Sequence, residues 1–297
     1  MGVRRQCRVV ALSAAAAGLL PSAGPSRAQT LPEKVWNDLR WAAGDAFFLV
    51  TSPLHSSSSD WRAAGWITAA TGASLLVDEP LDDWIVDNGS AFVIEPVHPF
   101  TEGHDARLEG LGSGSLMVQI AGVMYLAGLV FDSQDLRDAG IGCAAAEKTQ
   151  SAIRHGVYKV VSRRRPESAD GDPFMVSVPG GDWKDHSFFG GHGANIMTCA
   201  AFWTRRFDLG YAEPVIMGLA IGVGAGRVVD RKHWLSDALV GGVVGYVIGK
   251  TFADRQRGRV DGRRGEDVGS AGPPLGGLFV AKDGERVLLG MRRGLRF

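Results

Sequence analysis

The chain has 297 residues, of which 45% are hydrophobic, so it can bury a substantial core in one or two domains. Its 32 lysines and arginines balance 32 aspartates and glutamates, and the formal net charge is zero. Balanced charge provides no long-range basic field, which argues against nucleic acid as a partner.

The first 28 residues have the pattern of a signal peptide. Arginines come first, an alanine-rich apolar run follows to Leu20, and Ser26-Arg27-Ala28 fits a small-x-small cleavage site. We therefore expect export to the periplasm and a mature chain that starts near Gln29. The alternative is an inner-membrane protein whose active site faces the periplasm.

Two cysteines, Cys143 and Cys199, remain in the mature chain, because Cys7 lies in the signal segment. In an oxidising compartment they could pair. Both lie in apolar segments that we expect to be helical, and the sequence therefore favours buried free thiols over a disulfide.

The mature chain begins with residues typical of a helix N-terminus. Thr30-Leu31-Pro32-Glu33 has the composition of a capping box, which predicts a helix from Leu31 to Val50. A serine-rich loop follows, and Asp60 is expected to cap a second helix that carries the apolar run from Ala63 to Val77. We expect Asp78-Glu79-Pro80 to interrupt that run, with a short helix or loop to residue 88.

The segment from 89 to 105 has no clear periodicity, although it contains His98 and His104 close to Glu102 and Asp105. These residue types can bind metals, but no tight ligand spacing is present. We expect no metal site here and no cofactor elsewhere in the chain.

The longest apolar run, Leu111 to Phe131, is about long enough to cross a bilayer. The other runs, at 63–77, 214–226 and 238–249, fall below the roughly 20 residues that a span needs. A single marginal candidate favours a buried helix in a soluble bundle over a protein with several spans. Association with a membrane surface remains compatible with this composition.

The rest of the predicted domain, which extends from 29 to 252, is also helical. Further helices are expected at 133–162, 191–206, 211–229 and 233–252, and a loop at 167–185 is expected to close over the functional site. Glycines recur every fourth residue in the last two helices, at 218, 222 and 226 and at 241, 245 and 249, which permits close helix contacts.

The C-terminal part changes composition. Residues 253–274 are basic and rich in glycine, and we interpret them as a linker. In the tail, 275–297, Lys282-Asp283-Gly284 separates two apolar stretches, which predicts a short β-hairpin.

The segment from Gly226 to Asp237, GRVVDRKHWLSD, carries residues that suit phosphate chemistry. If the chain is helical from His233 onward, Asp237 lies one turn further along the same face. Its carboxylate could then accept a hydrogen bond from one ring nitrogen and leave the other nitrogen free as a nucleophile. Arg227 offers planar donors for phosphate oxygens.

This segment resembles the third motif, S-R-x5-H-x3-D, of the type 2 phosphatidic acid phosphatase (PAP2) and vanadium haloperoxidase superfamily, with Gly226 in place of serine. SFFGGHG, which begins at Ser187, is similar to the second motif, S-F-P-S-G-H-A. VYKVVSRRRP, which ends at Pro166, is similar to the first motif, K-x6-R-P. In the first motif Tyr158 occupies the position of the lysine, and Lys159 is next to it.

The resemblance implies an all-α helical bundle of the PAP2/haloperoxidase type and a metal-independent phosphatase. His233 would attack phosphorus to form a phosphohistidine, Asp237 would orient His233, and His192 would donate a proton to the leaving oxygen. The expected phosphate ligands are the side chains and backbone N–H groups of Arg165, Arg227, Lys159, Gly191 and Gly190.

The displaced lysine leaves a choice. One residue along a helix turns a side chain by about 100°. Either Lys159 reaches round to the phosphate, or Arg163 or Arg164 takes the lysine's place. His155 and His186 match no motif position, and we interpret both as surface or loop histidines.

The expected substrate is a phosphomonoester or a lipid phosphate or pyrophosphate. One alternative is a vanadate-dependent haloperoxidase, because vanadate resembles the phosphoryl transition state. Another is a non-catalytic envelope protein that binds a phosphorylated lipid. The short chain and single helical domain favour the phosphatase.

Overall fold

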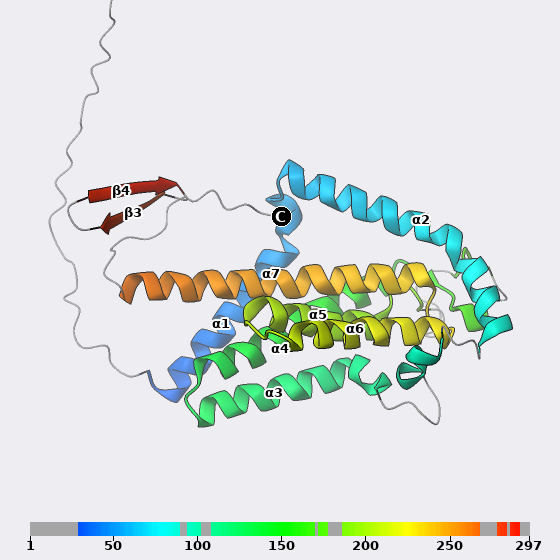
Figure 1. Ribbon diagram of the computed structural model, residues 1–297, viewed down its shortest axis with the longest axis horizontal. Helices are drawn as coiled ribbons and strands as arrows, with labels where there is room; N and C mark the ends of the chain where they lie inside the picture. The colour runs from blue at the N-terminus through cyan, green and yellow to red at the C-terminus, as the bar shows by residue number, and fades with distance from the viewer. Residues whose placement is uncertain are drawn as a thin grey trace, which may run out of the picture.

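The computed structural model describes residues 29–89, 94–101, 108–169, 172–177, 186–267, 278–283 and 286–291. Helices dominate it, and the predicted all-α fold is confirmed (Figure 1). The α-helices are α1 Leu31–Val50, α2 Ser58–Asn88, α3 Gly114–Val130, α4 Gln134–Tyr158, α5 Gly191–Arg206, α6 Ala212–Val229 and α7 Leu235–Asp267. The expected signal peptide lies outside the described residues.

Short elements connect the helices. Two 3₁₀ turns, η2 Glu95–Phe100 and η3 Glu109–Gly112, precede α3. Strands β1 Ser162–Arg163 and β2 Val176–Ser177 form a small antiparallel pair. Strands β3 Leu278–Asp283 and β4 Arg286–Met291 are also antiparallel, which confirms the hairpin predicted in the tail.

Helix α5 lies at the centre of the bundle, and most of its side chains are buried. Helices α3, α4, α6 and α7 run along the same long axis (Figure 1). The glycines of α7 allow a close approach to α5: a Cβ at Gly245 would lie 2.6 Å from the Ala194 carbonyl oxygen, and one at Gly249 would lie 2.1 Å from the Thr198 carbonyl oxygen. The glycine spacing therefore marks a tight helix contact, as the sequence indicated.

Cys143 and Cys199 form a disulfide bond between α4 and α5, with their Cα atoms 4.9 Å apart. The prediction of free thiols is therefore wrong. Both positions are completely buried in the core, where the two helix backbones come close enough for the sulfurs to meet. Apolar helical surroundings exclude water but do not prevent pairing.

Helix α2 is continuous through Pro80, so the predicted interruption at Asp78-Glu79-Pro80 is wrong. It also begins earlier than expected, because Ser57 rather than Asp60 is its N-cap. Asp60 instead accepts a hydrogen bond from the Ser57 N–H at 2.8 Å. Ion pairs from Asp78 and Asp82 to other parts of the chain hold the helix on both sides of the proline.

Helix α7 continues to Asp267, so residues 253–267, which were interpreted as part of a linker, are helical. Contacts with α1 explain the difference. Asp45 accepts hydrogen bonds from Arg255 at 2.6 Å and from both terminal nitrogens of Arg259 at 2.7 Å. Helix α4, by contrast, ends at Tyr158 instead of reaching Ser162.

Among the described residues, two helical segments are long and apolar enough to cross a membrane, Ala212–Val229 and Leu235–Gly262. The run expected to be the single candidate forms α3, which has only 17 residues. Large apolar side chains are also exposed on α1 and α2, including Trp36, Trp61 and Trp66. The outer surface of the bundle is therefore compatible with membrane association.

Candidate active site

A cavity of about 260 Å³ lies at one end of the bundle, where the C-terminal ends of α4 and α6 meet the N-terminal end of α5. Residues from all three predicted motifs line it: Arg165, Gly191, His192, Arg227 and His233. The sequence separates these residues by up to 68 positions, and the fold brings them to one cavity.

His233 lies just before α7 and is only 4% exposed. Its Nδ1 is 2.8 Å from the carbonyl oxygen of Ser187. A carbonyl only accepts hydrogen bonds, so Nδ1 carries the proton and Nε2 keeps its lone pair. Burial, followed by the charges of Arg227 and Arg165, lowers the pKa of His233 well below its usual value. The ring is therefore a neutral imidazole near neutral pH.

Asp237 does not bond directly to His233, which corrects the expected pairing. The helix begins only after His233, so the one-turn relation does not apply. The Asp237 carboxylate accepts hydrogen bonds from Arg163 Nη1 at 2.6 Å and from the Ser187 hydroxyl at 2.5 Å. Burial raises the pKa of Asp237, against the opposing effect of Arg163. Ser187 thus links the two residues, with its hydroxyl on Asp237 and its carbonyl on His233.

Arg163 is buried and does not line the cavity. Its guanidinium donates to Asp237, to the Ser236 hydroxyl at 2.7 Å and to Asp78 at 2.7 Å. Asp78 also accepts the backbone N–H of Ser236 at 2.9 Å. Arg163 therefore fixes α2 to the start of α7, and the hypothesis that it replaces the motif lysine is wrong. Arg164 does not line the cavity either.

A second set of ion pairs joins the first motif to the loop before α7. Arg231 binds both carboxylate oxygens of Asp82 at 2.8 Å and donates to the Pro166 carbonyl at 3.2 Å. Lys232 pairs with Glu167 at 2.7 Å. These contacts hold Arg165 and His233 on adjacent walls of the cavity. The roles of Asp78 and Asp82 were not predicted, because Asp78 precedes and Asp82 follows Pro80, which suggested a break in the helix.

Glu109, in η3, is an acidic residue beside two cavity residues, and the sequence did not reveal it. Its Oε1 lies 3.3 Å from Arg227 Nη1 and 3.7 Å from His192 Nε2. A single carboxylate therefore neighbours both a cation and the expected proton donor. No sequence motif marks Glu109, and it lies far from the three motifs along the chain.

Residues 142–259 match the model of the PAP2 superfamily. The match supports membership of the PAP2 superfamily. The matched segment contains all three motifs and runs from α4 into α7. Members of the superfamily are generally phosphatases, which supports hydrolysis of phosphoric esters at the family level. No curated protein and no solved structure matches the chain.

In the second PAP2 motif, the two glycines have different roles. The N–H of Gly190 donates to the carbonyl of Asp237 at 2.9 Å, so it is not available to a phosphate as expected. This bond fixes the start of α5 to α7, where a Cβ at Gly241 would lie 2.4 Å from the Gly190 carbonyl oxygen. Gly191 lines the cavity at the first position of α5. Its N-terminal location suits anion binding.

In the first PAP2 motif, the structure does not bring Lys159 to the cavity. Lys159 is exposed, whereas Tyr158 lines the cavity wall. His186 lies in a loop, as expected, but it also lines the cavity and stacks on Tyr158 with ring centres 4.7 Å apart. His155 is exposed, as expected of a surface histidine. Arg154, which sequence reasoning overlooked, lies on the wall one turn before Tyr158.

Two sequence hypotheses fall partly outside the described residues. Of the possible metal ligands between 89 and 105, only His98 is described, in η2, and Glu102, His104 and Asp105 are not. The loop expected to close over the site is described at 172–177 but not at 178–185.

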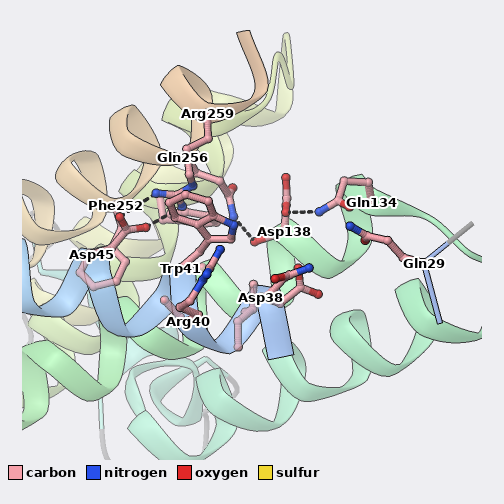
Figure 2. Close-up of a pocket in the computed structure, with 15 residues that line it drawn as sticks. Gln29, Asp38, Arg40, Trp41, Asp45, Gln134, Asp138, Phe252, Gln256 and Arg259 are labelled. Carbon is pink, nitrogen blue, oxygen red and sulfur yellow. Dashed lines mark hydrogen bonds and ion pairs between the residues drawn. The ribbon is translucent and has the colours of Figure 1, made fainter. Parts of the chain in front are cut away.

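A second cavity, of about 240 Å³, lies near the far end of α7 and is lined by α1, α4, α5 and α7 (Figure 2). Its charged side chains bind one another: Asp45 pairs with Arg259, and Asp138 accepts from Gln134 at 2.6 Å. It lies roughly 30 Å along α7 from His233, at 1.5 Å per residue. The Asp45 pairs hold α1 against α7, and the pair of Asp138 with Arg206 holds α4 against α5.

Proposed function

We propose that the protein is a metal-independent phosphatase that cleaves a phosphomonoester or a lipid phosphate or pyrophosphate through a phosphohistidine intermediate. The observation that carries the proposal is the common cavity of His192, His233, Arg165 and Arg227. Two histidines and two guanidinium groups match the needs of phosphoryl transfer, which are in-line positioning and compensation of charge on the phosphoryl oxygens.

His233 acts as the nucleophile. Its Nε2 lone pair attacks phosphorus while the bond from phosphorus to the leaving oxygen breaks. The Ser187 carbonyl accepts Nδ1–H and stabilises the positive ring that results, and Asp237 holds Ser187 in place. Arg165 and Arg227 bind the phosphoryl oxygens as their charge redistributes.

His192 acts as general acid and then general base. It donates a proton to the leaving oxygen, and it later takes one from the water that cleaves the phosphohistidine. The carboxylate of Glu109 is 3.7 Å from His192 Nε2, close enough to pair with the ring when the ring carries the proton that the first step needs. The second step releases inorganic phosphate and restores both rings.

The proposed location is the periplasm, either in solution or at the inner membrane. The disulfide between Cys143 and Cys199 supports export, because such bonds persist in oxidising compartments. The apolar surfaces of α6 and α7 support a lipid-linked substrate, whereas the polar cavity accepts a soluble ester equally well. Cell fractionation and turnover on a panel of lipid and soluble phosphates separate these cases.

The decisive experiment compares the mature chain with its His233→Ala variant. The variant should lose turnover and retain its thermal unfolding curve, and wild-type enzyme given labelled substrate and quenched in alkaline denaturant, where a phosphohistidine is stable, should carry phosphate on His233. The matched control is His155→Ala, at an exposed position that does not line the cavity, which should keep normal turnover. Normal hydrolysis by His233→Ala would eliminate the proposed nucleophile.

Further arms of this experiment test the competing functions. Loss of activity on addition of a chelator would indicate a metal enzyme. Bromide oxidation with added vanadate, without phosphatase turnover, would indicate a haloperoxidase. Binding of a phosphorylated lipid without any turnover would indicate a non-catalytic envelope protein.

A further inference from the structure

The inner face of α4 delivers two side chains to the cavity, Arg154 and Tyr158. They are four residues apart and therefore lie on the same face, one turn apart. Tyr158 stands where the first PAP2 motif has lysine. The helix face that normally carries a cation at that position thus carries one a turn earlier.

The guanidinium of Arg154 is placed against the second motif. Its Nη1 donates to Asn195 Oδ1 at 3.1 Å, and a Cβ at Gly191 would lie only 2.3 Å from the same nitrogen. Its Cζ lies 5.8 Å from the centre of the Tyr158 ring. Arg154 is therefore held beside the N-terminal end of α5, next to His192, by an amide on one side and an aromatic ring on the other.

One donor of Arg154 remains unused. Its Nε is buried and has no hydrogen-bond partner among the described residues. No direct ion pair in that part of the chain joins Arg154 to a carboxylate. Burial raises the pKa of the nearby Glu147, with the charges of Lys148 and Arg154 opposing, but Glu147 makes no ion pair with Arg154, and Glu109 pairs with Arg227 and His192. Buried polar atoms normally have partners, and a partly buried cation is stabilised by a counter-charge. An anion in the cavity meets both requirements.

The neighbouring residues do not supply this cation. Tyr158 is uncharged, and burial raises its pKa, so it stays protonated at neutral pH. Lys159 is exposed, and Arg163 is engaged by Asp78 and Asp237.

We propose that Arg154 binds the phosphate group of the substrate in place of the first-motif lysine, with Tyr158 and Asn195 fixing its orientation. The identity of the anion as the substrate phosphate rests on the proposed phosphatase function. The geometry itself requires only an oxyanion with several acceptor oxygens, which a planar guanidinium binds through more than one N–H.

The test measures binding of inorganic phosphate and of orthovanadate to the full mature chain by calorimetry. Arg154→Gln removes the charge but keeps an amide that can reach Asn195, and it should weaken binding by about 10- to 100-fold, as for loss of a hydrogen bond to a charged group. Arg154→Lys should retain part of the affinity. Lys148→Ala, on the exposed side of α4, should bind as the wild type does.

A relocation variant makes the test specific. Arg154→Gln combined with Tyr158→Lys returns the cation to the motif position and should recover at least half of the lost binding free energy. A merely structural role for Arg154 predicts no recovery. Wild-type affinity in Arg154→Gln, or an equal loss in Lys159→Ala, would overturn the proposal.

The unmutated chain gives a readout that does not depend on the folding of any variant. Saturating phosphate should protect Arg154 from modification by phenylglyoxal, as located by mass spectrometry of peptides. Modification of Arg154 at the same rate with and without phosphate would overturn the assignment.

The two proposals can fail separately. Phosphate binding through Arg154 without turnover would contradict the phosphatase function and leave the role of Arg154 intact. Turnover by Arg154→Gln with unchanged phosphate binding and unchanged KM would contradict the role of Arg154 and leave the phosphatase function intact.

Discussion

The three consecutive arginines of the first motif allow a sharp comparison of two side chains that differ in role. Arg163 is 5% exposed and lies between the carboxylates of Asp78 and Asp237, at 2.7 and 2.6 Å. Arg165 lines the cavity instead. We predict that Arg163→Met destabilises the fold, whereas Arg165→Met mainly weakens phosphate binding.

The magnitude follows from the charges left behind. Removing Arg163 leaves two buried carboxylates without their shared cation, which costs about 3–5 kcal/mol when one partner of a buried pair is lost. In a domain of this size, the melting temperature should fall by about 10 °C. Burial already raises the pKa of Asp237 with Arg163 present. In Arg163→Met the folded state therefore binds protons more readily than the unfolded state, and the deficit should shrink as the pH falls toward about 4.

Thermal unfolding followed by circular dichroism at pH 7 and pH 4.5, with phosphate affinity measured in parallel, checks this prediction. Arg165→Met is the matched control, two residues away and of the same chemistry. A melting temperature for Arg163→Met within about 2 °C of wild type would refute the argument from buried charge, given the expected shift per kcal/mol. Equal destabilisation by Arg165→Met would refute the division of roles.

Three further predictions follow from the described contacts. Because the pKa of His233 is lowered well below 6.5, the limb of the pH–rate profile that reports the neutral nucleophile should lie well below pH 6.5. Lowering the pH below 6.5 should also destabilise the fold, since His233 takes up a proton in the unfolded state before it does so in the folded state. An acidic limb near pH 6.5 or above would contradict this. Reduction of the disulfide, which closes a separation of 56 residues, should cost about 4 kcal/mol of stability, measured by thermal unfolding with and without reductant. No change would show that the bond is absent in solution. Gly249→Ala, whose Cβ would meet the Thr198 carbonyl, should destabilise by about 1–3 kcal/mol, whereas Gly242→Ala, with nothing within 4 Å, should be neutral or slightly stabilising. The reverse order would contradict the close contact of α5 and α7.

The sequence predicted helices where local signals were strong. The capping box at Thr30 and Glu33 marked the start of α1, where the Thr30 N–H donates to Glu33 at 2.8 Å. The start and end of α5 were also predicted correctly. These elements depend on short-range capping and periodicity, which one sequence displays directly.

Predictions failed where distant residues override local preference. Pro80 suggested a break in α2, but Asp78 and Asp82 are held by Arg163 and Arg231, far along the chain. Glycines and basic residues after 252 suggested a linker, but Asp45 stabilises α7 there. Local composition contains no information on such partners.

The cavity residues were likewise predicted only in part. Motif spacing selected His192, His233, Arg165 and Arg227, and the fold brings these four residues to one cavity. It misplaced Asp237 relative to His233, because the exact start of α7 decides their geometry. Motif spacing missed Arg154 because the motif places its cation at position 158. Only the folded helix shows that the side chain at position 154 lines the same cavity.

The role of α2 bears on how far the PAP2 segment can stand by itself. Asp78 and Asp82 lie well outside residues 142–259, yet they neutralise the arginines that keep the first and third motifs in register. A fragment trimmed to the family boundaries would leave Arg163 and Arg231 without their acids. A transplanted or redesigned PAP2 segment must therefore include α2, which no motif marks. A change of charge at Arg163 or Arg231 must be matched by a change at Asp78 or Asp82.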